Sequence, residues 1–267
     1  LILEGDGQFR RPGPDPDAYG SGRVAVLDGV VEEIDGGLFR ERPVDPGPEH
    51  LGVSPAEIYR ALRRLPVSVS RSEAARLLPE RSAELEEIFA THADVGRYRL
   101  RDVTVYGVGE CRRSDLFAGR LAAGDLAEVG EMMRVSHDGD RVVRHRDGRA
   151  RRFRPSYADR RLDKLIRQAR SDDEADRRAA ALWAQPGRYA CSREEIDLIV
   201  DTATGVDGVV GAQLAGAGLG GCAMVLARGE ALEGLLGALN GSYYEPRRLP
   251  ADAIVCRPVA GSGLLGA

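Results

Sequence analysis

The stretch "GAQLAGAGLGGCAMVLA", residues 211–227, restricts the possible folds of this chain more than any other feature, because it joins a glycine cluster directly to an apolar run. The glycines are Gly211, Gly216, Gly218, Gly220 and Gly221. Glycine loses more conformational freedom on folding than any other residue, so such a cluster indicates backbone that bends unusually or approaches another group closely. The following run, "CAMVLA", is typical of a strand. We therefore expect a glycine loop that precedes a strand.

Two general interpretations of the cluster follow from its spacing. Gly216, Gly218 and Gly221 satisfy G-x-G-x-x-G, the dinucleotide-binding fingerprint. That fingerprint requires a helix that opens inside the glycines and an acidic residue about 20 positions later. The residues that follow are strand-like, and residues 238–242 hold no carboxylate, which disfavours a dinucleotide-binding oxidoreductase. A glycine-rich hairpin with two closely packed strands stays open.

Composition sets broad limits. The 267 residues, 43% of them hydrophobic, suit one large domain or two small ones with a real core. No apolar run approaches the roughly 18 residues of a membrane span, and the N-terminus lacks a signal-peptide pattern, so we expect a soluble, cytoplasmic protein. The net charge of -4 predicts no general attraction to nucleic acid or membranes. The four cysteines lack the paired spacing of a zinc site or disulfide scaffold, so we expect reduced thiols and no metal site.

The N-terminal half predicts short elements. Residues 1–50 alternate apolar runs with glycine and proline clusters, which indicates a strand or hairpin between loops. Helical spacing begins with "SPAEIYRALRRL" at residues 54–65 and continues in two further short helices. Residues 97–108, "RYRLRDVTVYGV", predict a strand. Two helices follow, the second opened by a capping box of Asp125 and Glu128.

The C-terminal half has a more regular pattern. Residues 138–188 are dense in charge and poor in core residues, which predicts a partly helical insertion. Ser192 and Glu195 predict a second capping box, before a helix that ends at Gly205. Strands are expected on both sides of the glycines, then an amphipathic helix closed by Gly241 and a last strand, "ADAIVCRP". This order predicts an α+β layer in which helices cover one face of an antiparallel sheet.

The stretch "GAQLAGAGLGGCAMVL" resembles the C-terminal glycine motif of the GHMP kinases, the family of galactokinase, homoserine kinase and mevalonate kinase. Upstream, "YACSREEIDLIVDTATGVDGVVGAQ" and "GDLAEVGEMMRVSH" are similar to segments of its galactokinase branch. "RYRLRDVTVYGVGECRR" stands where that branch has a basic strand. The resemblance covers approximately residues 97–137 and 189–258, and the glycine motif is its most specific part.

This resemblance implies an α+β, ferredoxin-like GHMP kinase C-terminal domain at residues 51–267, with an antiparallel sheet and residues 138–188 as a charged helical insertion. Residues 1–50 would be a remnant of the preceding N-terminal domain or a connecting hairpin. The family's phosphate loop, of the type Pro-x-x-x-Gly-Leu-x-Ser-Ser, and its catalytic aspartate belong to the N-terminal half and have no counterpart in this sequence. Because the sequence starts at Leu1, we expect the catalytic half upstream or in a separate polypeptide.

The function implied by the resemblance is that of an ATP-dependent, galactokinase-like sugar kinase. Such an enzyme uses ATP and Mg²⁺ and transfers the γ-phosphate to a hydroxyl group of a monosaccharide. The alternative is a non-catalytic relative that senses a sugar or nucleotide or binds a partner. By resemblance, Gly216, Gly218, Gly220 and Gly221 bind nucleotide and substrate, since glycine lets backbone N–H groups approach phosphate oxygens. No catalytic residue is expected within the chain.

Weaker candidates accompany the glycines. Gln213 stands where the family has Arg or Lys, so a polar contact near the phosphates is lost. His137 matches the family's Ser-His pair, but a histidine at a helix end also serves as a cap or a packing residue. Tyr59 would contact the sugar or, alternatively, pack in the core. The arginines of residues 144–170 suggest a nucleic-acid surface, but interspersed aspartates dilute the charge and favour a solvated insertion.

Overall fold

The computed structural model describes residues 2–4, 53–216 and 221–256. Nearly all of the predicted N-terminal hairpin, together with Gly218 and Gly220, lies outside the described residues. The described chain divides into two compact units. The sheet unit comprises residues 2–4, 116–155, 188–216 and 221–256, and the helical unit comprises residues 53–115 and 156–187.

This division separates the two parts of the predicted insertion. Residues 138–155 belong to the sheet unit, and residues 156–187 belong to the helical unit. The domain boundaries expected from the sequence, with residues 51–267 as one domain, stay a prediction.

The helical unit starts with helix α2, Pro55–Arg64. The Ser54 hydroxyl accepts a hydrogen bond from the Glu57 N–H, and the Glu57 carboxylate accepts one from the Ser54 N–H. This reciprocal cap satisfies backbone donors that a helix start leaves free. The predicted helix is therefore confirmed at its first residue.

Helix α2 packs against helix α7, Asp159–Gln168, through apolar residues at helical spacing. The buried core of the unit consists of Tyr59, Leu62, Val105, Tyr157, Leu162, Leu165, Ala180 and Leu182. Several of these residues belong to the stretch 138–188, so the expectation that this stretch is poor in core residues is wrong. The composition of this stretch averages the charged outer face of α7 with its apolar inner face, and so does not reveal the apolar stripe.

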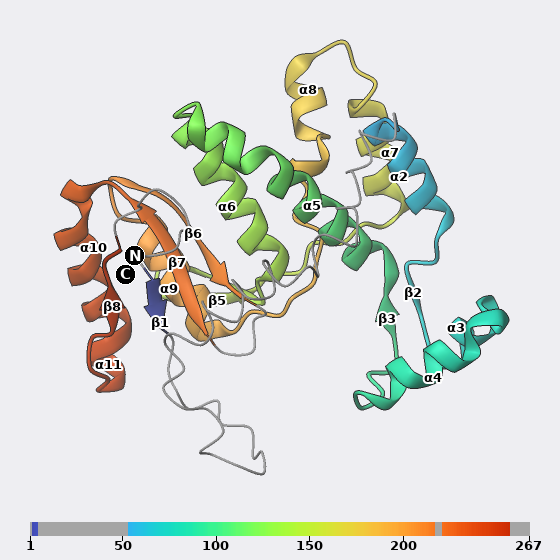
Figure 1. Ribbon diagram of the computed structural model, residues 1–267, viewed down its shortest axis with the longest axis horizontal. Helices are drawn as coiled ribbons and strands as arrows, with labels where there is room; N and C mark the ends of the chain where they lie inside the picture. The colour runs from blue at the N-terminus through green and yellow to red at the C-terminus, as the bar shows by residue number, and fades with distance from the viewer. Residues whose placement is uncertain (1, 5–52, 217–220, 257–267) are drawn as a thin grey trace, which may run out of the picture. The chain divides into compact units, whose positions relative to one another are not determined.

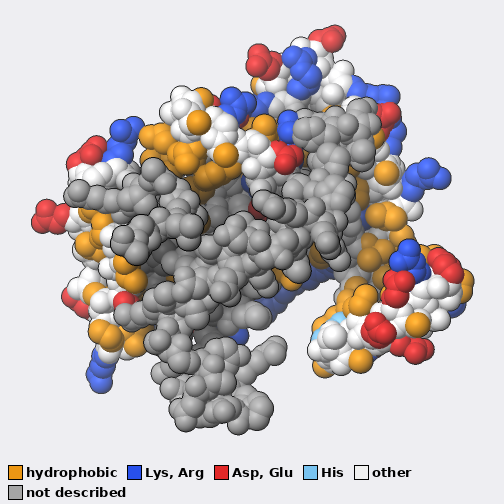
Figure 2. Space-filling model, in the orientation of Figure 1, with side chains coloured by type: hydrophobic (Ala, Val, Ile, Leu, Met, Phe, Trp, Pro, Cys, Tyr) orange, Lys and Arg blue, Asp and Glu red, His pale blue; other side chains and the backbone are white. Residues whose placement is uncertain are grey.

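The other elements of the helical unit are short. They are β2 (Ser68–Val69), α3 (Arg71–Leu77), η2 (Pro79–Arg81), α4 (Ser82–Ala90), β3 (Tyr98–Arg99), α8 (Glu174–Ala179) and η3 (Leu182–Ala184). None of α3, η2 and α4 has a buried residue. Figure 2 accordingly shows both charged and apolar side chains on the surface of α3 and α4.

The strand predicted at residues 97–108 is wrong beyond its first residues. Only β3 is a strand, paired with β2, and helix α5, Leu100–Ala122, begins directly after it. The alternation of β-branched residues with polar ones favoured a strand. The buried residues recur instead at helical spacing: Arg101, Asp102, Val105, Gly109 and Arg113. Two of them are arginines whose partners lie far along the chain, such as the carbonyls of Trp183 and Gln185 for Arg113.

The sheet unit contains a four-stranded antiparallel sheet in the order β6-β7-β1-β8. The strands are β6 (Val209–Ala215), β7 (Cys222–Ala227), β1 (Ile2–Glu4) and β8 (Ala253–Ile254). The predicted strands on both sides of the glycine cluster are confirmed. The unit mixes helices with a small antiparallel sheet, and its ferredoxin-like topology stays a prediction.

Helices α9, Glu194–Thr204, and α10, Leu232–Leu239, bury the apolar core of this unit with the strands β6 and β7. The core residues are Ile196, Ile199, Val200, Ala203, Ala212, Leu214, Ala223, Val225, Leu235, Leu239, Tyr243 and Tyr244. Ala212 and Leu214 alternate along β6 with half-buried Gln213. This period of two places Gln213 on the opposite face from the core.

Helix α6, Leu126–Asp140, lies against β6 at the edge of the sheet (Figure 1). It begins at the predicted N-cap, since the Asp125 side chain accepts a hydrogen bond from the Glu128 N–H. The second half of the predicted capping box is missing, because the Asp125 N–H donates to the Arg120 carbonyl at 3.0 Å. The contact with β6 is backbone to backbone. A Cβ atom added to Gly130 would stand 2.0 Å from the Val210 carbonyl oxygen. Glycine at position 130 therefore lets α6 cover the edge strand directly.

Two helix boundaries differ from the prediction. Helix α9 ends at Gly205 as expected, but it starts with Arg193 as its N-cap and has no capping box of Ser192 and Glu195. The Ser192 hydroxyl instead donates to the buried carboxylate of Asp197 at 2.8 Å. Because this acceptor is charged, the hydrogen bond is stronger than one between two neutral groups.

The chain after α10 does not stop at Gly241. It continues as a π-helical turn, η5 (Asn240–Tyr244), and a last helical turn, α11 (Glu245–Arg247). Both Tyr243 and Tyr244 are buried in the core, so packing overrides the glycine stop signal. The remaining elements of the sheet unit are the hairpin β4 (Val143–Arg146) and β5 (Arg149–Arg152), and η4 (Gly229–Ala231).

Candidate functional site

The glycine loop connects the two strands of an antiparallel hairpin, because Ala215 of β6 pairs with Cys222 of β7. Gly216 has φ +81°, a left-handed conformation that costs other residues roughly 1–2 kcal/mol. No atom among the described residues lies within 4 Å of a Cβ added there. At Gly221 the nearest atom to an added Cβ is the Ala215 carbonyl oxygen at 3.5 Å. Of these two glycines, Gly216 has the backbone conformation that favours glycine.

Gln213 lies on β6 three positions before Gly216. It pairs with Met224 of β7, and directly opposite residues of an antiparallel pair share one face of the sheet. That face is opposite to the buried Ala212 and Leu214. Gln213 is half-buried, and its predicted contact near the phosphates stays a prediction.

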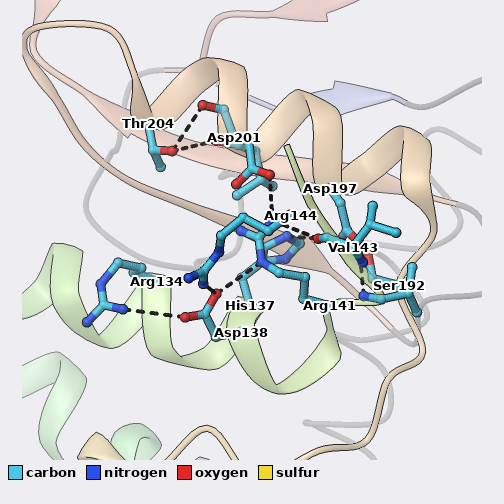
Figure 3. A network of polar contacts seen from close by, with 12 residues as sticks. Arg134, His137, Asp138, Arg141, Val143, Arg144, Ser192, Asp197, Asp201 and Thr204 are labelled. Carbon is cyan, nitrogen blue, oxygen red and sulfur yellow. Dashed lines mark hydrogen bonds and ion pairs between the residues drawn. The ribbon is translucent and has the colours of Figure 1, made fainter. Parts of the chain in front are cut away.

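His137 lies in the last turn of α6 and joins three elements (Figure 3). Its ring is fully buried, at 0% exposure, and its Nδ1 accepts a hydrogen bond from the Leu214 N–H of β6 at 3.2 Å. Its Nε2 lies 3.2 Å from Oδ1 of Asp197 on α9. Because Nδ1 is the acceptor, the neutral ring carries its proton on Nε2, facing the carboxylate.

The contact between His137 and Asp197 is chiefly electrostatic. Nε2 is within ion-pair distance of the carboxylate but makes no well-aligned hydrogen bond among the described residues. His137 therefore serves to position strand β6. His137 holds an outward-facing N–H of the edge strand β6, two residues before Gly216, and connects it to α9.

Asp197 is the centre of the buried polar contacts and is also 0% exposed. Its carboxylate accepts hydrogen bonds from the N–H groups of Val142 and Val143, at 2.9 and 2.8 Å, and from the Ser192 hydroxyl at 2.8 Å. Burial alone would raise the pKa of Asp197, but the interactions with His137, Val143 and Ser192 outweigh it and hold the pKa below its ordinary value. Asp197 therefore stays ionised and ties the start of β4 to α9.

A cluster of arginines adjoins this pair. The Asp138 carboxylate accepts from Arg134 at 3.4 Å, from Arg141 at 3.0 Å and from Arg144. Arg141 also donates to Asp201 at 2.7 Å. Figure 3 shows these side chains converging from α6, α9 and the β4 segment. The network brings several positive charges together beside the buried His137.

Cys191 precedes this network and is not set up as a nucleophile. Its thiol donates to Oδ1 of Asp140 at 3.1 Å. Burial, the hydrogen bond to Asp140 and the negative charge of Asp140 raise the pKa of the Cys191 thiol to about 12. The thiolate, which is the reactive form, is therefore scarce at neutral pH.

Tyr59 belongs to the helical unit, whereas His137, Gln213 and Gly216 belong to the sheet unit. Tyr59 is fully buried, and its hydroxyl donates to the Ala180 carbonyl at 2.8 Å. Burial raises the pKa of this phenol. The geometry favours the packing interpretation of Tyr59 over the sugar-contacting one.

Asp197 and its donors at residues 142 and 143 were not identified from the sequence, whereas His137 was a candidate. A signal was available, because Asp197 falls among Ile196, Val200 and Ala203, which form the apolar face of α9. A carboxylate on an apolar helix face predicts a buried, paired acid. The donors themselves come from residues 142 and 143, and the sequence alone gives no indication of that contact.

Comparison with known proteins gives one informative similarity. No protein-family model matches the chain. The chain is similar to a galactokinase from Roseiflexus sp. (strain RS-1), with 27% identity over 178 residues that cover 67% of this chain and 34% of that protein. The match thus spans about a third of the length of that relative. It indicates a galactokinase-like relative. Among the described residues, no helix is long and apolar enough to span a membrane.

Proposed function

We propose that this chain is the C-terminal, ferredoxin-like GHMP kinase portion of a galactokinase-like sugar kinase. The whole enzyme would transfer the γ-phosphate of ATP to a hydroxyl group of a monosaccharide. The observation that carries the proposal is the similarity to the Roseiflexus galactokinase over 178 residues. The glycine motif at the β6–β7 connection supports it, because it combines a strand, a glycine loop and a second strand.

The role proposed for the glycine loop is to position phosphates. Phosphoryl transfer depends on alignment and charge stabilisation more than on covalent participation of the protein. Backbone N–H groups of a glycine loop approach phosphate oxygens without obstruction by Cβ atoms. We assign this role to Gly216, Gly218, Gly220 and Gly221. The printed sequence holds no Pro-x-x-x-Gly-Leu-x-Ser-Ser stretch, so the catalytic groups are assigned to residues outside it.

The strand that leads into the loop is fixed at two points. Gly130 and Gly211 let the backbones of α6 and β6 meet, since a Cβ on Gly211 would stand 3.0 Å from the Gly130 Cα. Three residues further along β6, the His137 ring holds the Leu214 N–H. Loop residues that must meet a ligand accurately gain from such a rigid support. His137 is therefore proposed as a positioning residue for the loop.

Kinases of this kind use Mg²⁺ with ATP. Among the described residues, no group of three or more His, Cys, Asp or Glu side chains is placed to hold a metal ion. We therefore name no metal ligand among these residues.

A coupled assay of ADP formation with a panel of monosaccharides tests the proposal. It compares the 267-residue chain with the product of the longer reading frame from the nearest upstream start codon. The proposal predicts sugar-dependent turnover by the longer protein and none by the chain alone. Turnover by the chain alone would contradict the assignment of the catalytic groups. Binding of ATP or sugar by the longer protein without turnover would favour a non-catalytic, sensing relative.

A further inference from the structure

The sheet unit contains a pocket between α6, α9 and the hairpin β4–β5 that the proposed kinase function does not use. Its volume is about 290 Å³, and its charged and imidazole lining consists of Arg134, Arg141, Arg144, Arg146, His145 and Asp201. No described residue of the glycine loop lines it. We propose that this pocket binds a small phosphate-bearing anion, at a site separate from the glycine loop and independent of the kinase activity.

The pocket has more positive than negative side chains in its lining. Arg134, Arg141 and Arg144 share the carboxylate of Asp138, and Arg141 also pairs with Asp201. The lining arginine Arg146 is exposed and has no ion pair in the part of the chain that the structure describes. Among the residues that line the pocket, four arginines face one carboxylate, Asp201. Asp138 and Glu131, which pair with Arg134, lie outside the lining. The excess positive charge attracts an anion.

The arginine side chains of the pocket are also preorganised, since other protein groups already hold them in place. Arg141 is only 4% exposed and is held between Asp138 at 3.0 Å and Asp201 at 2.7 Å. The guanidinium of Arg144 stacks 4.4 Å over the ring of Phe153. Side chains that are already ordered cost little additional conformational entropy when they bind a ligand. Planar guanidinium groups match phosphate oxygens in geometry as well as in charge.

His145 adds a further polar residue to the pocket wall. Its backbone N–H donates to Asp201 at 2.7 Å, which fixes this part of the wall beside Arg144 and Arg146.

The size of the pocket selects among phosphate ligands. Small-molecule pockets have volumes of roughly 300–1,000 Å³, so about 290 Å³ is at the lower limit. Such a volume suits inorganic phosphate or a sugar monophosphate better than a nucleotide. The chemistry that these two share is a single dianionic phosphate group.

Calorimetric titration of the chain with inorganic phosphate, and separately with glucose 1-phosphate, tests the inference. The test variant is R144Q/R146Q, which removes two lining arginines. The matched control is R149Q/R151Q, because Arg151 and Arg149 face Arg144 and Arg146 across the hairpin and do not line the pocket. We expect saturable binding that weakens about tenfold or more in R144Q/R146Q and stays within about twofold in the control. Circular dichroism checks that each variant is folded.

The outcomes separate the possibilities. Absence of saturable binding by the parent chain, or unchanged affinity in R144Q/R146Q, would overturn the inference. Equal weakening in both double variants, together with binding of single-stranded RNA, would also overturn it, since the affinity would then belong to the whole hairpin surface. Under the expected outcome, tighter binding of glucose 1-phosphate identifies a sugar monophosphate, and equal affinities identify free phosphate.

Discussion

Replacement of Gly130 by alanine tests the contact that places α6 on the edge of the sheet. Two effects oppose each other. Alanine inside a helix is more favourable than glycine by about 1 kcal/mol, which would stabilise α6. The new Cβ, however, would stand 2.0 Å from the carbonyl oxygen of Val210 and 2.9 Å from its carbonyl carbon. The opposing group is backbone, so it cannot move aside by rotating a side chain.

The magnitude follows from the required displacement. A real Cβ atom essentially never lies within 3.0 Å of a non-bonded heavy atom, and this one would lie 2.0 Å from the Val210 carbonyl oxygen. Helix α6 and strand β6 must therefore separate by about 1 Å. Overpacking of this kind costs about 1–3 kcal/mol, and loss of the hydrogen bond between Leu214 and His137 adds about 1 kcal/mol. After subtraction of the helix gain, Gly130→Ala should lower the free energy of unfolding by about 1–3 kcal/mol.

Urea unfolding followed by circular dichroism measures this change. Gly119→Ala is the matched control, since Gly119 is helical, belongs to the same unit, and has no atom of the described residues within 4 Å of an added Cβ. The control should be neutral or more stable than the parent by at most about 1 kcal/mol. Equal stability of Gly130→Ala and Gly119→Ala would refute the direct contact between α6 and β6.

Three further predictions concern buried polar groups. Asp197→Asn should destabilise the chain by about 3 kcal/mol in urea unfolding, because an amide N–H₂ would face backbone N–H donors or the His137 ring. The pKa of Asp197 is lowered from 3.8 in the folded protein. The ionised carboxylate therefore stabilises the fold fully above about pH 4, and this stabilisation is lost as the pH falls through the folded-state pKa. Below about pH 4 the Asn variant should accordingly lose less stability than the parent chain. Cys191, whose pKa is about 12, should react with a disulfide reagent at neutral pH far more slowly than exposed Cys111. The reaction rates of Cys191→Ser and Cys111→Ser measure this difference, and equal rates would contradict the environment assigned to Cys191. Tyr59→Phe should cost about 1–2 kcal/mol by leaving the Ala180 carbonyl unpaired and leave the sugar KM of the longer protein unchanged, whereas a raised KM would restore the sugar-contacting interpretation.

Local signals in the sequence predicted the elements that depend on local chemistry. Helical spacing in residues 54–65 predicted α2, which begins at Pro55, and Asp125 identified the start of α6. The strands beside the glycine loop followed from their apolar pattern, and they pair with each other in antiparallel orientation. These features depend on side chains within a few residues of one another.

Elements that depend on distant partners were not predictable in this way. Residues 97–108 read as a strand because their valines alternate with polar residues, yet they form α5, in which Arg113 is buried against the Trp183 carbonyl. Ser192 was expected to cap α9 and instead donates to Asp197. Arg113 pairs with a residue 70 positions away, and such a pairing overrides local propensity. Ser192 pairs only five positions along the chain, with a buried carboxylate that was not identified from the sequence.

The central claim is that the glycine loop positions phosphates for sugar phosphorylation. The most direct measurement is kcat/KM for sugar-dependent ADP formation by the longer protein carrying Gly216→Val. Gly124→Val is the matched control. Gly124, in the turn between α5 and α6, has φ +72° compared with +81° at Gly216, and neither glycine has a described atom within 4 Å of an added Cβ. Both variants therefore carry similar backbone strain, of roughly 1–2 kcal/mol.

Gly216→Val should lower kcat/KM about tenfold or more, since a side chain would stand between the loop backbone and the phosphates. Gly124→Val should retain parental turnover at the same degree of folding. Parental turnover by Gly216→Val, or an equal loss in both variants, would contradict the role assigned to the loop.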